Sequence, residues 1–164
     1  MTENKVDIHI RTAEPADASS IAAVLGESFI EYKASYTNKA FAETTPECEQ
    51  IIGRMTEGPI WVALQNAAIV GTVSVVSHND ALYIRGMAVL PSYRGNRIGA
   101  LLLNQVENFA SSHNYTRLFL STTPFLTGAI QLYERMGFKR SNKGPYDLFG
   151  TPLFTMEKDV EASG

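Results

Sequence analysis

The chain has 164 residues, 45% of them hydrophobic and 19% charged, which predicts a single domain spanning residues 1–164. The formal net charge of -3 argues against general nucleic-acid binding, because neutralising phosphates requires a basic surface. No apolar run reaches the roughly 18 residues of a membrane span, and the first residues lack the basic and apolar regions of a signal peptide, so we expect a cytoplasmic protein without membrane contact.

Cysteine and histidine usage predicts neither disulfides nor bound metal. Cys48 is the single cysteine, which excludes an intrachain disulfide, and we expect it in the core on one side of a helix. The three histidines are scattered along the chain, so no metal site is expected.

The N-terminal part predicts a strand followed by two helices. Residues 7–13 alternate as in a strand, and Pro15 suits the first turn of a helix whose apolar positions continue to Phe29. Thr44 or Thr45, with Pro46 and Glu47, predicts the start of a second helix that ends near residues 58–59.

The middle of the chain predicts three strands and a long helix. Two strand patterns, at residues 59–65 and 68–78, flank a turn near Asn66 and indicate a hairpin. A third strand, at residues 81–90, ends before Pro91, and an amphipathic helix follows from about Ile98 to Asn114.

The C-terminal part predicts a strand at residues 117–122, a short helix at 129–136 that ends at Gly137, and two closing strands, around Phe138 and at 153–159. Strands clustered before the long helix and single crossovers after it indicate a mixed sheet with helices on both faces. The loop before the last strand, within residues 143–154, is a candidate for closing over a substrate.

The junction between Arg94 and Ala100 predicts an anion site. A glycine-containing loop that leads directly into a helix offers unpaired backbone amides and the positive end of the helix dipole. Gly99 would let a ligand approach closely, and Arg94 and Arg97 add positive charge. A simple strand-to-helix turn explains the same residues equally well.

Two motifs resemble the GCN5-related N-acetyltransferase (GNAT) superfamily. The stretch "MAVLPSYRGNRIGALLL" is similar to its acetyl-CoA-binding motif, and "AIQLYERMGF" is similar to a second motif downstream. The resemblance spans about residues 8–158. It implies an α/β (α+β) fold with a mixed, mostly antiparallel sheet of about seven strands and about four flanking helices, and it implies an acetyl-CoA-dependent N-acetyltransferase.

The resemblance also implies where acetyl-CoA binds as co-substrate. The pyrophosphate would lie on the loop and helix start, and the pantetheine arm would pair as an extra strand with a splayed sheet edge. The implied residues are Met87, Ala88, Val89, Arg94, Gly95, Asn96, Arg97, Ile98, Gly99, Ala100 and Leu126. Two of them depart from the family pattern, because Arg97 replaces a glycine and Leu126 replaces an asparagine.

By the same resemblance, Tyr133 is the general acid that protonates the departing thiolate, and the backbone amide near Val89 is the oxyanion donor. An aromatic side chain that fills the core is the alternative for Tyr133. The usual glutamate base is absent from the strand that holds Met87, so a water chain is expected instead. The other candidate acids are more typical of solvated surface charges: Glu27, Glu31, Glu43 and Asp80.

The acceptor side is expected at Glu31, Tyr32, Tyr36 and Arg85. Arg85 suits recognition of a substrate carboxylate, and pairing with a structural acid explains it as well. The aromatic residues suit a pocket for a small-molecule or peptide amine, or a packed helix face. The apolar last strand would allow the protein to form a homodimer.

Three functions compete. Direct acetyl transfer in a ternary complex is favoured, because no nucleophilic Cys or Ser context supports an acyl-enzyme. A non-catalytic coenzyme A-binding sensor or partner module is the alternative. A nucleotide-binding protein is set aside, because neither a Walker lysine nor a Rossmann acidic residue is present.

Overall fold

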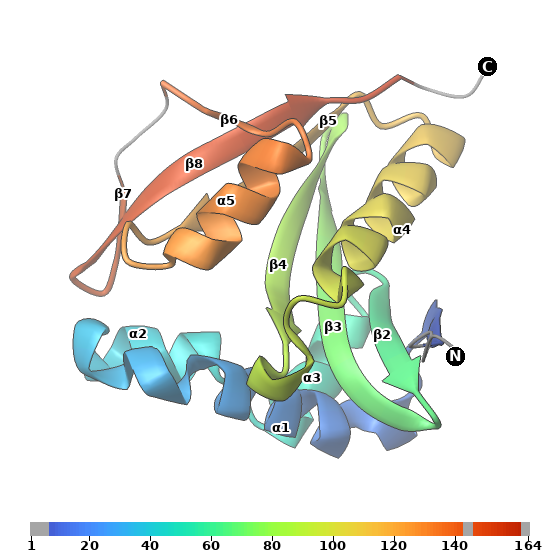
Figure 1. Ribbon diagram of the computed structural model, residues 1–164. Helices are drawn as coiled ribbons and strands as arrows, with labels where there is room; N and C mark the ends of the chain where they lie inside the picture. Colours follow the sequence, from blue (N-terminus) through green and yellow to red (C-terminus); the bar gives the residue numbers. More distant parts are fainter. Residues whose placement is uncertain (1–6, 143–145, 162–164) are drawn as a thin grey trace, which may run out of the picture.

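The computed structural model describes residues 7–142 and 146–161 (Figure 1). Within these ranges an eight-stranded sheet is flanked by five α-helices and three short 3-10 helices. The strands are β1 (Ile8–Thr12), β2 (Ile60–Gln65), β3 (Ala68–His78), β4 (Ala81–Val89), β5 (Arg117–Thr122), β6 (Lys139–Arg140), β7 (Tyr146–Leu148) and β8 (Thr151–Asp159). The α-helices are α1 (Ala18–Phe29), α2 (Asn38–Thr44), α3 (Cys48–Met55), α4 (Ile98–Ser112) and α5 (Thr127–Arg135), and the 3-10 helices are η1 (Pro15–Asp17), η2 (Ile30–Ser35) and η3 (Pro91–Tyr93).

The sheet is mixed and mostly antiparallel, as expected. Its strand order is β1-β2-β3-β4-β5-β8-β6, with β7 paired to β8, and the single parallel pair in the described sheet is β4 with β5. The hairpin turn between β2 and β3 falls at Asn66 and Ala67, both left-handed, which confirms the predicted position.

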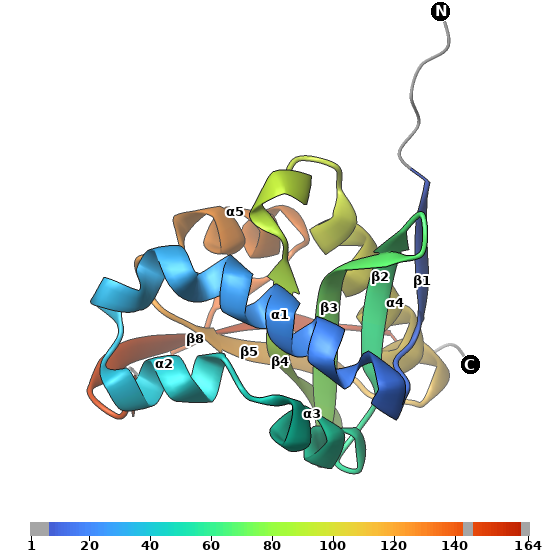
Figure 2. The ribbon, with the colours of Figure 1, turned by 90° about the horizontal axis from the view of Figure 1, so that it is seen from below.

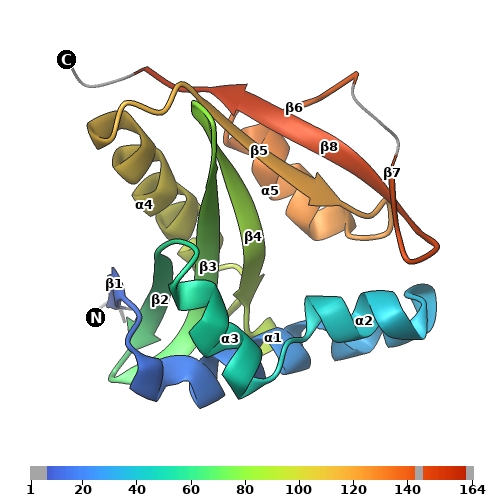
Figure 3. The same ribbon diagram turned by 180° about the vertical axis from the view of Figure 1, so that it is seen from behind.

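Helices cover both faces of the sheet (Figures 1 and 3). Alternate residues of β2 point to opposite sides, so that Trp61 packs against Phe109 of α4 while Val62 belongs to the apolar cluster that includes residues of α1 and α3. Each face thus has its own apolar cluster, and Figure 2 shows α1 lying across the sheet on the side away from α4.

Two elements were not expected from the sequence, α2 and β7. The α2 helix buries Ala40 alone among its seven residues, which leaves no apolar period to detect. It is fixed at its start by Thr37, whose Oγ1 accepts a hydrogen bond from the Ala40 amide at 3.2 Å. The short β7 extends the predicted loop into a hairpin with β8, while residues 143–145 of that loop lie outside the described residues.

The predicted start of the second helix is wrong. The hydroxyls of Thr44 and Thr45 donate to carbonyls of α2 at 2.9 and 2.7 Å, so both residues end α2. The following helix, α3, is capped by Glu47, whose backbone amide donates to Gln50 Oε1 at 2.9 Å in a capping box. Cys48, expected in the core, is exposed at the first position of α3.

None of the helices formed by the described residues combines the length and apolar character that crossing a membrane requires.

Candidate active site

The strand β4 separates from β5 halfway along its length (Figure 1). Parallel pairing between them ends at Ile84, whereas β4 stays paired with β3 as far as Val89. The register against β3 shifts at this point, opposite Gly86, whose φ of 65° is left-handed. Because a β-bulge bends its strand, the glycine marks where the sheet opens. The structure therefore contains the splay that the family resemblance implied.

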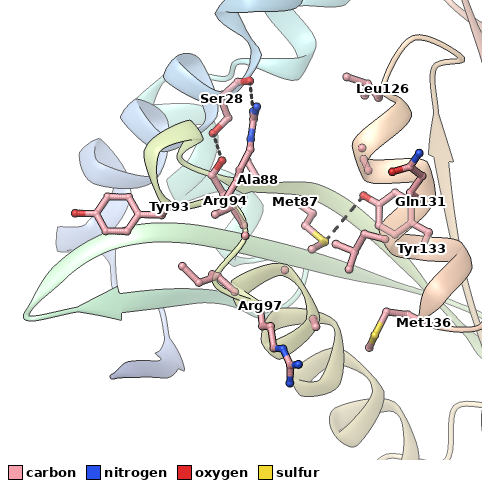
Figure 4. Close-up of a pocket in the computed structure, with 18 of the residues that line it drawn as sticks. Ser28, Met87, Ala88, Tyr93, Arg94, Arg97, Leu126, Gln131, Tyr133 and Met136 are labelled. Carbon is pink, nitrogen blue, oxygen red and sulfur yellow. Dashed lines mark hydrogen bonds between the residues drawn. The ribbon is translucent and has the colours of Figure 1, made fainter. Parts of the chain in front are cut away.

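A cavity of about 670 Å³, the first cavity, lies beside the open edge of β4 (Figure 4). Its walls come from the end of α1, the end of β4, the loop before α4 and one side of α5. The predicted cofactor residues that line it are Met87, Ala88, Val89, Arg94, Gly95, Arg97, Ile98, Gly99, Ala100 and Leu126. Asn96 is in the same loop, but its side chain donates to the Tyr93 carbonyl at 3.3 Å and is outside this lining.

The loop before α4 presents amides and charge to the first cavity. Arg97 caps the helix in a left-handed conformation with φ of 60°, and Gly95 has φ of 88°. The Leu101 amide donates to the Arg97 carbonyl at 3.0 Å, so the amides ahead of it in the first turn have no acceptor within the helix. Such amides favour an anion. The left-handed backbone gives Arg97 a conformational cost that glycine would not have at this position.

Arg94 connects this loop to α1 and η2. Its guanidinium pairs with Glu31 at 2.7 Å and donates to the Ser28 carbonyl at 3.2 Å, while the Ser28 hydroxyl donates to the Val89 carbonyl at 3.1 Å. In Figure 4 Arg94 and Arg97 extend to opposite sides of the loop. Glu31 therefore holds Arg94 at the first cavity and does not line the second cavity described below.

Gly99 lines the first cavity and also serves packing. A Cβ atom at this position would lie 2.6 Å from Leu132 Cδ2 and 3.4 Å from Met87 Cε. The missing side chain thus lets α4 approach Leu132 of α5 closely.

Tyr133 lies where α5 faces the open edge of β4. Its side chain is buried, at 8% exposure, and its hydroxyl lies 4.0 Å from Met87 Sδ, as the dashed line in Figure 4 shows. Burial, and then the nearby Tyr36, raise the pKa of Tyr133 to about 12. The phenol is therefore protonated at neutral pH and available as a hydrogen-bond donor. Its ring also packs edge-on against Phe138, so it fills the core as well.

A second cavity of about 370 Å³ adjoins the first. It lies between β4, β5, the end of α2 and the β7–β8 hairpin, where Leu148 and Leu153 line it. Four residues line both cavities: Phe29, Met87, Leu126 and Tyr133. These four residues, called the junction below, mark where groups bound in the two cavities would meet.

The predicted acceptor residues divide between the two cavities. Tyr36 and Arg85 line the second cavity, whereas Tyr32 lines the first. Tyr36 packs edge-on against Phe125 at 4.9 Å, and Tyr32 lies 5.9 Å from the same ring. The aromatic residues thus form a packed cluster that is also part of a cavity wall, so both interpretations of their pattern apply.

Arg54 in the second cavity was missed by the sequence analysis. It is near the end of α3 and only 13% exposed, and burial lowers its pKa below the usual value for arginine. No motif marks it, because α3 reaches the β4 bulge through tertiary packing alone. Glu43 is the carboxylate that lines the second cavity among the residues the structure describes, and no three His, Cys, Asp or Glu side chains in that same part gather as a metal site would require.

A splayed mixed sheet with an amide-rich loop at a helix start is the N-acetyltransferase fold. The chain belongs to the acetyltransferase (GNAT) family, whose model matches residues 23–138. Curated relatives include N-acetylaspartate synthetase from Danio rerio, 32% identical over 108 residues, and the mouse protein of that name, 29% identical over 124 residues. These alignments cover 65% and 74% of this chain but only 38% and 41% of the relatives, so the chain spans about two fifths of their length.

Solved structures share the fold. The PaiA N-acetyltransferase of Thermoplasma acidophilum, solved in complex with coenzyme A, superposes with a TM-score of 0.81 at 19% identity, covering 94% of this chain and 99% of that one. Ard1 from Thermoplasma volcanium superposes with a TM-score of 0.77 at 21% identity, covering 93% and 97%.

Proposed function

We propose that the protein transfers an acetyl group from acetyl-CoA to the primary amine of a small molecule, an amino acid or a peptide, directly and within a ternary complex. The observation that carries this proposal is the junction. The first cavity, beside the loop before α4, and the second cavity, beside Arg85, meet at the junction. The adjoining edge of β4 is open for an extended ligand. One cavity suits coenzyme A and the other suits the acceptor.

The residues of the first cavity fit coenzyme A. The free amides at the start of α4, together with Arg97, would hold the pyrophosphate, and the open edge from Met87 to Val89 would hold the pantetheine arm. Leu126 gives that arm an apolar contact in place of an amide. When bound, acetyl-CoA supplies the thioester whose acetyl group is transferred.

The acceptor must present a neutral amine to the junction. Its nitrogen forms a bond to the acetyl carbon, the carbon–sulfur bond breaks, the amine sheds a proton and the thiolate gains one. Because the pKa of Tyr133 is about 12 and that of a thiol is about 8.5, the phenol favours a hydrogen bond to the departing sulfur over complete loss of its proton. The proton that the amine loses passes to solvent, and the thiolate, stabilised by the hydrogen bond from Tyr133, takes up its proton from solvent.

Direct transfer is supported by the position of the cysteine. Cys48 is exposed at the start of α3 and lines neither cavity. The names of the relatives, N-acetylaspartate synthetase, indicate an amino-acid acceptor for those proteins, which places amino acids first among the acceptors to test here.

The test is release of free thiol from acetyl-CoA against a panel of amines, amino acids and short peptides, with mass spectrometry of the acetylated product. We expect release that depends on the acceptor, with one N-acetylated product per thiol. Tight coenzyme A binding without release for any acceptor would overturn the proposal in favour of a non-catalytic coenzyme A-binding module.

A further inference from the structure

Two arginines line the second cavity on the side of the β4 bulge. Arg85 is on β4 directly before Gly86, and Arg54 reaches the same place from α3. A Cβ atom at Gly86 would lie 3.5 Å from Arg54 Nη1, so the glycine leaves the guanidinium lying against bare backbone. The bulge that opens the sheet thus also brings two positive charges to one wall.

Arg54 uses little of its hydrogen-bonding capacity within the protein. Its Nη2 donates to the Glu43 backbone carbonyl at 3.2 Å, and Glu43 Oε1 stands 4.0 Å away, at the limit of an ion pair. A guanidinium carries five N–H donors in a fixed fork. At 13% exposure, most of those donors are removed from bulk water.

Arg85 has one carboxylate partner and one buried donor to spare. Its Nη2 pairs with Glu57 Oε2 at 2.9 Å, whereas its Nε atom is buried and makes no hydrogen bond among the described residues. Glu57 is half exposed and is not in the lining of the cavity. A buried N–H without an acceptor costs free energy that a ligand oxygen would recover.

The charges facing the second cavity are therefore unbalanced. Its lining holds two arginines against one carboxylate, that of the half-exposed Glu43. Burial lowers the pKa of Arg54, and the charge of Arg85 lowers it further. Two partly buried like charges with free donors are an environment in which a bidentate anion binds well.

We infer that Arg54 and Arg85 together bind a carboxylate of the acceptor, which makes the acceptor a free amino acid. The inference rests on the proposed function, because it assumes that the second cavity holds the amine. Arg85 is two residues before Met87, about 7 Å along a strand. The arginine side chains and the amino acid together bridge this distance, with the carboxylate at the guanidinium groups and the nitrogen toward the junction, and a cavity of about 370 Å³ accommodates such an acceptor.

The test compares acceptors that differ only in the carboxylate. Amino acids are assayed beside their amides, β-alanine beside ethylamine, and phosphoethanolamine is included as an amine that carries the other common anion. We expect wild-type protein to favour each amino acid over its amide by at least about tenfold in kcat/KM, because arginines left without an anion are penalised.

The variants Arg54→Gln and Arg85→Gln each remove that preference. We expect KM for the amino acid to rise about tenfold or more while kcat changes less, so that the ratio of kcat/KM for β-alanine to that for ethylamine falls toward one. Arg117→Gln is the matched control, because Arg117 also pairs with a glutamate at 2.9 Å but lies in neither cavity. Arg54→Lys, which keeps the charge and loses the fork, should fall between wild type and Arg54→Gln.

Thermal unfolding of each variant shows whether it is folded. If Arg54→Gln does not fold, the selectivity of Arg85→Gln tests the inference alone. Equal use of amino acids and their amides, or a preference for phosphoethanolamine, would overturn this inference and leave the acetyltransferase standing. Unchanged selectivity in folded Arg85→Gln would overturn it too. Absence of transfer to every acceptor would overturn the proposed function and this inference with it.

Discussion

The hydroxyl of Tyr133 lies 4.0 Å from the sulfur of Met87, across the gap between α5 and the open edge of β4. Both residues line both cavities. A group entering between them would meet the phenol on one side and an unpaired strand edge on the other. The position of this contact makes Tyr133 the side chain best placed to act on a departing sulfur.

Replacing Tyr133 with Phe is expected to lower kcat by about a hundredfold, because the donor to the departing sulfur is lost. Stability should change by less than about 1 kcal/mol, because the hydroxyl has no stronger partner than a sulfur at 4.0 Å. Coenzyme A affinity, measured by titration calorimetry, should stay within about threefold of wild type.

Tyr115→Phe is the control for this variant. Its hydroxyl donates to Ser77 Oγ at 3.0 Å and lies in neither cavity, so its loss should leave kcat unchanged. Undiminished turnover in Tyr133→Phe would remove the tyrosine from the chemistry and leave it as a core residue.

Replacing Arg97 with Gly separates backbone strain from charge. The left-handed conformation costs a non-glycine residue about 1–2 kcal/mol. Glycine avoids this strain, but it loses more conformational entropy on folding, so the net gain in stability is smaller. We expect the melting temperature to rise by up to about 3 °C, and coenzyme A affinity to fall about tenfold at low salt.

Arg97→Lys keeps both the charge and the strained backbone, so its melting temperature should match wild type and its affinity should fall less. A lower melting temperature for Arg97→Gly would show that the arginine side chain contributes more to folding than its backbone costs.

Elements with a strong local signal were predictable from the sequence. The helix α4 begins at Ile98 as expected, because the apolar spacing after the loop is clear. The turn at Asn66 followed from local chemistry too. In contrast, α2 buries one residue, and the roles of Thr44 and Thr45 depend on which helix they adjoin.

The candidate site was predictable mainly from its motifs, with Tyr36 and Arg85 named from their side-chain chemistry alone. The loop before α4 and Tyr133 belong to contiguous motifs, so they were found. The positive wall at Gly86 joins residues 31 positions apart, Arg54 and Arg85, and depends on a bulge that no local pattern announces. The packing role of Gly99 was not predicted, because Leu132, which lies where a side chain at residue 99 would be, comes from another helix.

The double variant Gly99→Ala with Leu132→Ala tests that packing. Gly99→Ala alone should destabilise the protein by about 1–3 kcal/mol, because its Cβ would press on Leu132 Cδ2. In the Leu132→Ala background the same change should cost at least about 1 kcal/mol less, as urea unfolding would measure. Gly26→Ala is the control, since a Cβ there meets nothing within 4 Å in the α1 helix and should stabilise by about 0.5–1 kcal/mol. Equal cost in both backgrounds would contradict the contact.

The hydrogen bonds to the Asp17 carboxylate predict that the free energy of unfolding decreases in acid. Its carboxylate takes two hydrogen bonds from Arg11, at 2.8 and 3.0 Å, and one from the Glu14 amide at 2.8 Å. The bond from Arg11 lowers the pKa of Asp17 below its ordinary 3.8. A lowered folded-state pKa means that the carboxylate stabilises the fold above pH 3.8, and that this stabilisation is lost as the pH falls through the folded-state value.

The variant Asp17→Asn should therefore cost about 1–2 kcal/mol at pH 7, where the bonds to the charged group are lost. The difference from wild type should shrink as the pH falls below 3.8, because wild-type Asp17 then takes up its own proton. Urea unfolding from pH 7 down to pH 2.5 measures this difference. Arg11→Gln should remove much of the same pH dependence, since Arg11 is its main cause. A constant gap between wild type and Asp17→Asn over the whole range would show that the charge of Asp17 does not contribute, and that shape and hydrogen bonding alone hold η1 against β1.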